Sequence, residues 1–140
     1  MKSLVQFIKE SSSITPNDII TCVTKGLNLE GNKEFNKVFT KDLKEFCKAF
    51  DSCEISFNSK VSKENVDAAA QAIKSNRNIK VQGLKDSTFK DAEDGSWTSK
   101  GIDLRDPEKV GDINIYTGES GFLVEINDQE VMVYSEDYAF

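Results

Sequence analysis

Apolar and polar residues alternate along the last part of the chain, between Asp112 and Tyr134. A period of two is typical of strands that bury one face. The alternating apolar residues fall into three groups: Ile113 and Ile115; Phe122, Val124 and Ile126; Val131 and Val133. Gly118 with Gly121, and Asn127 with Asp128, supply residues for two reversals between these groups. We therefore predict a three-stranded antiparallel meander with one buried face, and with Met132 and Tyr134 on the other.

The first half of the chain carries the apolar spacing of amphipathic helices. One helix is expected to begin after Thr15, an N-cap residue followed by Pro16, and to end at Gly26. Residues 33–50 form a longer helical region, with a break predicted near Thr40. The apolar faces of these helices are expected to cover the meander, because a bare three-stranded sheet is only marginally stable.

Between these two regions, a strand, a helix and a second strand are predicted. Alternating residues at 53–57 and 79–81 indicate the strands, and Ser62 is the expected N-cap of the helix between them. The two strands can pair in parallel or antiparallel. The predicted fold class is α+β: an N-terminal helical layer packed on a small sheet that ends in the meander. Residues 14–140 are expected to form one domain, preceded by a helix and serine hinge at residues 1–13.

The net charge is unevenly distributed, although the composition is ordinary for a globular chain. The formal net charge of the 140 residues is -6, with +3 in residues 1–80 and -9 in residues 81–140. An acidic C-terminal half repels nucleic acid and suits a basic partner, the alternative being a solvated surface. No apolar run is long enough to cross a bilayer, and no secretory signal is present, so neither a nucleic-acid nor a membrane partner is expected.

Several kinds of catalytic and metal site lack the residues they require. The chain has no histidine, which excludes Ser-His-Asp and Cys-His nucleophiles. Cys22, Cys47 and Cys53 match no zinc spacing and are expected to be free thiols. If Gly95 took the sixth position of an EF-hand loop, Lys90 would occupy the first, where a carboxylate is required. We predict a non-enzyme without metal or cofactor.

The irregular region 83–111 and the C-terminus supply candidate contact residues. Trp97 is the only tryptophan, and it is either an exposed contact residue or a lid on the core. The aromatic residues of the last three positions are expected to pack down or to bind a partner. The candidate partner contacts are Trp97, Asp91, Glu93, Asp94, Tyr138 and Phe140.

The first eleven residues predict a short amphipathic helix. Ser3 and Gln6 have the spacing of a capping box, and Leu4, Phe7 and Ile8 share one helical face. A helix of this length does not hold in water by itself, so that face is expected to dock on the core or on a partner.

The same residues resemble the N-terminal leader of head-internal proteins of T-even-type tailed phages. That leader opens with Met-Lys-Ser/Thr and an apolar residue and continues to Phe/Tyr-Ile/Leu-x-Glu, as the segment from Met1 to Ser11 does here. The resemblance implies targeting into the assembling head. It also implies cleavage by the prohead protease after an Ile/Leu-x-Glu triplet, here Ile8-Lys9-Glu10, between Glu10 and Ser11.

Two hypotheses of function follow. The first is a small tailed-phage virion protein, packaged in the head or attached to the capsid, that binds phage head components. The second is a phage-encoded inhibitor in the host cytoplasm that binds a host enzyme or defence protein through the acidic half. A small enzyme or nucleotide-binding protein is the remaining alternative.

Overall fold

The computed structural model describes residues 14–84, 96–97, 102–103, 107–118 and 121–135. Within these ranges the helices are α2 (Pro16–Leu27), α3 (Lys33–Ala49) and α4 (Lys63–Ala72). Six strands form one mixed sheet in the order β2-β1-β8-β7-β6-β5. Their bounds are Ile79–Gly83, Cys53–Phe57, Gln129–Ser135, Gly121–Ile126, Ile113–Thr117 and Glu108–Val110, and β3 (Ser96–Trp97) pairs separately with β4 (Ile102–Asp103). The predicted α+β class is confirmed.

The predicted meander is present as β6, β7 and β8, all antiparallel to their neighbours. The backbone N–H of Gly118 donates to the carbonyl of Gly121 over 2.9 Å at the first reversal. At the second reversal Asn127 adopts a left-handed φ of 56°. Asparagine tolerates that conformation better than most residues, so the Asn-Asp pair is a sound turn signal.

The prediction that only one face of the meander is buried is wrong. Met132 is 1% exposed and Tyr134 is 0% exposed. They form a second apolar cluster with Tyr116 and Leu123, separate from the main core. Strand β8 lies between β7 and β1 inside the sheet. A central strand that is covered on both faces buries both sets of alternating residues, so its apolar run is nearly continuous.

The strand-helix-strand unit has parallel strands, which decides the alternative that the sequence left open. Strand β1 pairs in parallel with β2, and Cys53 lies opposite Ile79. On its other side β1 pairs antiparallel with β8. Helix α4 connects β1 to β2, as a parallel pair requires. Ser62 caps α4 as predicted, because its hydroxyl accepts the N–H of Asn65 over 3.2 Å.

The helix starts agree with the prediction better than the helix ends. Thr15 caps α2 by accepting the N–H of Asp18 over 3.2 Å. The predicted end at Gly26 is wrong: α2 continues to Leu27, and Asn28 takes the left-handed cap position with φ of 58°. The predicted break at Thr40 is also wrong, because α3 runs without interruption to Ala49. The Thr40 hydroxyl donates to the carbonyl of Asn36 inside the helix.

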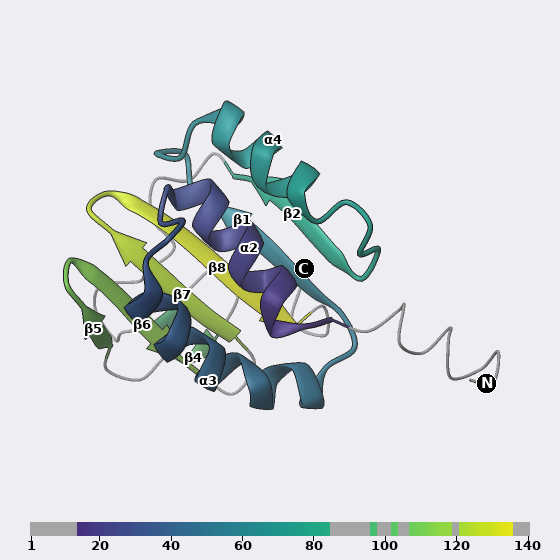
Figure 1. The fold of residues 1–140 in the computed structure, drawn as a ribbon, viewed down its shortest axis with the longest axis horizontal. Coiled ribbons are helices and arrows are strands. Elements are labelled where there is room, and N and C mark those ends of the chain that lie inside the picture. Colours follow the sequence, from purple (N-terminus) through teal and green to yellow (C-terminus); the bar gives the residue numbers. More distant parts are fainter. Residues whose placement is uncertain (1–13, 85–95, 98–101, 104–106, 119–120, 136–140) are drawn as a thin grey trace, which may run out of the picture.

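The main core lies between the three helices and one face of the sheet (Figure 1). Helix α4 lies at the β2 end of the sheet and α3 toward the opposite end, with α2 between them. Two rings of α3, Phe39 and Phe46, contact Phe122 of β7 in edge-on arrangements, with ring centroids 5.5 and 5.3 Å apart. These aromatic contacts fix α3 on the meander.

Candidate functional site

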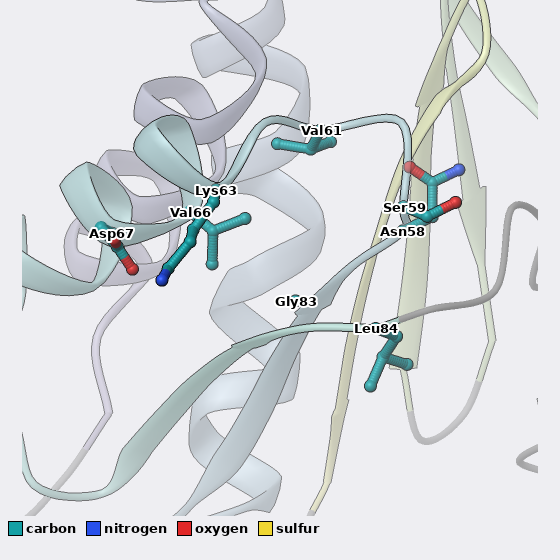
Figure 2. A pocket seen from close by; sticks show the side chains of 8 residues that line it. All are labelled: Asn58, Ser59, Val61, Lys63, Val66, Asp67, Gly83 and Leu84. Atoms are coloured by element: carbon teal, nitrogen blue, oxygen red, sulfur yellow. The ribbon is translucent and has the colours of Figure 1, made fainter.

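A pocket of about 600 Å³ lies where the two parallel strands end (Figure 2). Phe57 and Gly83 are register partners at the ends of β1 and β2, and the N–H of Leu84 donates to the carbonyl of Phe57 over 2.7 Å. The chain after β1 leads into α4, whose first turn forms another side of the pocket. Ligands of open α/β sheets bind at this position, outside the carboxyl ends of parallel strands. The lining residues are Asn58, Ser59, Val61, Lys63, Val66, Asp67, Gly83 and Leu84.

The pocket combines an apolar lining with a few polar groups. Val61 and Val66 are buried, and Leu84 is half-buried. The positive end of the α4 dipole and the Lys63 ammonium favour a negative group at that side, while Asp67, one turn further along α4, opposes it. The volume of the pocket lies within the range typical of small-molecule sites. The lining therefore suits a small ligand with an apolar part and one polar or anionic group.

Asn58 holds the strand end that forms one wall of this pocket. Its side chain donates to the carbonyl of Asp128 over 2.9 Å and to Oε1 of Glu130 over 3.2 Å. Its Oδ1 accepts the N–H of Glu130 over 3.2 Å. Asn58 is 1% exposed and Glu130 is 4% exposed. The buried amide therefore ties the end of β1 to the β7–β8 turn, which is a structural role.

A polar cluster lies on the sheet face opposite the helices. The phenol of Tyr134 donates to Oε2 of Glu54 over 2.6 Å, and the hydroxyls of Tyr134 and Ser56 are 3.1 Å apart. Gln82 donates to Ser56 over 3.0 Å. Burial, followed by the hydrogen bond to Glu54, raises the pKa of Tyr134 to about 12. The phenol stays protonated at neutral pH, so the cluster satisfies buried polar groups and does not generate a nucleophile.

Two carboxyl groups meet between α3 and β5. Burial, followed by a hydrogen bond and repulsion from Glu108, raises the pKa of Asp42 to about 6. Oδ2 of Asp42 is buried and has no hydrogen-bond donor among the described residues. A proton shared between the two carboxyl groups would satisfy this oxygen. The protonation state of Asp42 therefore changes in mildly acidic solution.

The outer face of α3 carries a row of five exposed lysines, Lys33, Lys37, Lys41, Lys44 and Lys48. They are three or four residues apart, which places them on one side of the helix. The buried residues of α3 lie on the opposite side. The first four lysines, with Asn36 and Thr40, line an open hollow of about 490 Å³. Oδ1 of Asn36 is buried there and has no hydrogen-bond partner in the described part of the chain.

Most of the contact residues predicted from the sequence lie outside the described residues. This holds for Leu4, Phe7, Ile8, Glu10, Ser11, Asp91, Glu93, Asp94, Tyr138 and Phe140. For Trp97 the backbone alone is placed, in β3 opposite Ile102. Neither the lysine row nor the pocket was predicted from the sequence. The lysine spacing was available as a signal, whereas the pocket depends on the parallel pairing of β1 with β2.

The three cysteines are free thiols, as predicted. Burial raises the pKa of Cys22 to about 12, and burial followed by the charge of Asp18 raises that of Cys47 to about 11. In the ranges that the structure describes, no three acidic, cysteine or histidine side chains gather as metal ligands. None of the described helices has the length and apolar character that a bilayer crossing requires.

Comparison with known proteins adds no relative. No protein-family model, no curated protein and no solved structure matches this chain.

Proposed function

We propose that this protein is a small component of a tailed-phage particle, packaged in the head or attached to the capsid, which acts by binding another protein. The observation that carries the proposal is the segment from Met1 to Ser11, which resembles the leader of head-internal phage proteins. On this account the leader directs the chain into the assembling head, and the prohead protease then removes it after Glu10.

The local structure around Ile14 supports a detachable leader. Ile14 is 3% exposed and belongs to the main core. Thr15 then caps α2 with its own hydroxyl, and Pro16 takes the first helical position. A cut between Glu10 and Ser11 leaves all three residues in place, so the start of α2 keeps its anchor and its cap.

A reporter experiment tests the proposed role of the leader. Residues 1–13 are fused to an unrelated fluorescent protein, which is produced in cells infected by the phage that encodes this chain. Purified particles should carry the fluorescence, at a level well above that given by a matched fusion with Leu4→Ser and Phe7→Ser. Equal incorporation of the two fusions, or of neither, contradicts a targeting function of the apolar face.

The inhibitor hypothesis shares action by contact but requires a basic host partner. Asp112 and Asp128 support it, because both are exposed and their turns lie at the same end of the sheet, where Ile113 pairs with Ile126. Tagged protein should then capture a basic host protein from lysate, and Asp112→Asn with Asp128→Asn should weaken that complex. Capture that is unaffected by salt and by both substitutions contradicts this hypothesis.

A third candidate function is binding of a small molecule, favoured by the position of the pocket at the ends of β1 and β2. Nucleotides are the first ligands to test, because the start of α4 and Lys63 favour an anionic group. A nucleotide should raise the melting temperature of the protein, and Val66→Trp, which fills the pocket, should abolish that rise. A melting temperature that no nucleotide changes contradicts a nucleotide-binding function.

A further inference from the structure

The lysine row of α3 has the length and regularity of a binding surface. Successive lysines are roughly 4.5–6 Å apart along the helix axis, and the row from Lys33 to Lys48 extends over about 22 Å, at about 1.5 Å per residue. Lys48 has a weak ion pair with Glu45, at 3.9 Å. The other four lysines form no ion pair within the described ranges. A concentrated positive row therefore faces outward on a chain of net charge -6.

The lysines of this row lie on the side of α3 that does not pack on the core. The helix is held from its opposite side, where Phe35, Phe39, Leu43 and Phe46 are buried. Like charges three and four residues apart repel one another and weaken a helix. An anionic partner would reduce the repulsion among the four ammonium groups that have no ion pair.

Acidic residues flank the row and restrict the kind of anion that fits. These residues are Glu34 and Glu45, which are exposed next to the lysines. A partner helix with glutamate or aspartate at three- and four-residue spacing, flanked by its own basic residues, matches this pattern, as paired helices do in coiled coils. Nucleic acid presents a uniform negative backbone that the flanking acids repel. The row also contains no arginine, whose planar guanidinium forms two parallel hydrogen bonds with phosphate.

We infer that the outer face of α3 binds an acidic helix of a partner protein, through Lys33, Lys37, Lys41 and Lys44. This inference rests on the proposed function, because it names the chemistry of the head component that the protein would contact. Binding should weaken steeply with salt, as expected for ion pairs at an exposed surface.

The test measures binding of a fluorescent helical peptide of about 18 residues, long enough to follow most of the row. The peptide carries glutamate at every third or fourth position, and a second peptide carries glutamine there instead. The full chain is compared with the variant Lys33→Gln/Lys37→Gln/Lys41→Gln/Lys44→Gln. A control variant, Lys60→Gln/Lys74→Gln/Arg77→Gln/Lys109→Gln, makes the same change in net charge at exposed basic residues outside α3. Circular dichroism melts establish that both variants are folded.

The glutamate peptide should bind the full chain and the control variant with similar Kd, and the row variant roughly ten-fold or more weakly. The glutamine peptide should not bind. Absence of binding to the full chain, or an equal loss in both variants, overturns the inference. Duplex DNA binding to the row more tightly than the glutamate peptide also overturns it, because the surface would then be a nucleic-acid site.

The fate of the full chain in phage particles is measured separately. A chain that is found in particles but does not bind the glutamate peptide contradicts the α3 inference alone. A chain that binds the peptide through the row but is absent from particles contradicts the proposed function alone.

Discussion

The ring of Phe57 occupies the space that a side chain at Gly26 would need. A β-carbon at Gly26 would lie 2.2 Å from Cε1 and 2.4 Å from Cζ of that ring. Phe57 is 0% exposed, so the ring cannot swing into solvent. Gly26 is thus a point of close approach between α2 and β1, and it lies inside the helix although glycine usually weakens a helix.

The substitution Gly26→Ala should destabilise the protein by about 1–3 kcal/mol, the usual cost of overpacking a core. At an unobstructed helix position the same change would instead stabilise by up to about 1 kcal/mol. Gly83→Ala is the matched control, because its β-carbon would meet Val66 at an ordinary 3.5 Å. Urea unfolding measures both variants. A Gly26→Ala protein that is more stable than the parent would show that the close approach is absent.

The phenol of Tyr134 should matter both for stability and for its dependence on alkaline pH. Tyr134→Phe removes the hydroxyl that donates to Glu54 over 2.6 Å. The free energy of unfolding should fall by about 1–3 kcal/mol, as it does when other hydrogen bonds to charged groups are removed. The pKa is raised from 10.0 to about 12, chiefly by burial. The neutral phenol therefore contributes stability that is complete below about pH 10 and is lost as pH rises through 12.

The ultraviolet titration curve of Tyr134→Phe is subtracted from that of the parent protein. The difference should show a phenol that ionises near pH 12. The unfolding free energy of the parent should also fall more steeply than that of the variant above about pH 10. A difference titration centred on the ordinary tyrosine pKa would contradict the buried hydrogen bond to Glu54.

The raised pKa of Asp42, beside Glu108, predicts a second loss of stability with rising pH, here on the acidic side. The pKa of Asp42 is raised from 3.8 to about 6, so its protonation contributes stability that is complete below about pH 4 and is lost as pH rises through 6. Asp42→Asn should therefore stabilise the protein at neutral pH. We expect about 1 kcal/mol or less, because the carboxyl is partly exposed and solvent screens the repulsion.

Urea unfolding at about pH 5 and about pH 7.5 measures this effect, which should be larger at the higher pH. Glu45→Gln, at an exposed carboxyl one turn along α3, is the control and should change little at either pH. An Asp42→Asn protein that is less stable than the parent at neutral pH would mean that the ionised carboxylate has a stabilising partner.

Removal of residues 1–10 should leave the folded body nearly as stable as the full chain. Ile14 and the Thr15 cap remain in the fragment 11–140, so α2 keeps its start. The melting temperatures of the fragment and the full chain should agree within a few degrees. For a domain of this size, that corresponds to a difference of less than about 1 kcal/mol in unfolding free energy. A fragment that does not fold would show that residues 1–10 are needed by the core and are not a detachable leader.

The sequence predicted best those elements whose signals are local. The three strands of the meander follow from the period of two, and their second turn follows from Asn127. Thr15 and Ser62 mark helix starts because a capping hydroxyl bonds to an N–H only three residues away. These signals do not depend on the rest of the fold.

The errors arose where distant residues decide the outcome. A glycine such as Gly26 usually marks the end of a helix. Here a glycine is needed because the ring of Phe57, distant in sequence, leaves no room for a side chain. Tyr134 and Met132 are buried in a second cluster with Tyr116 and Leu123, which forms only when β6, β7 and β8 come together. The pocket beside Asn58 likewise exists only because β1 and β2 are parallel. The predictions for the contact residues, Trp97 among them, stay predictions.

The proposed phage-particle function is tested most directly by mass spectrometry of purified particles of a phage whose genome carries this sequence. The particles should contain the protein, enriched over a non-structural phage protein used as control. The protein recovered from the particles should begin at Ser11. A protein that is abundant in infected cells and absent from the particles would contradict the account.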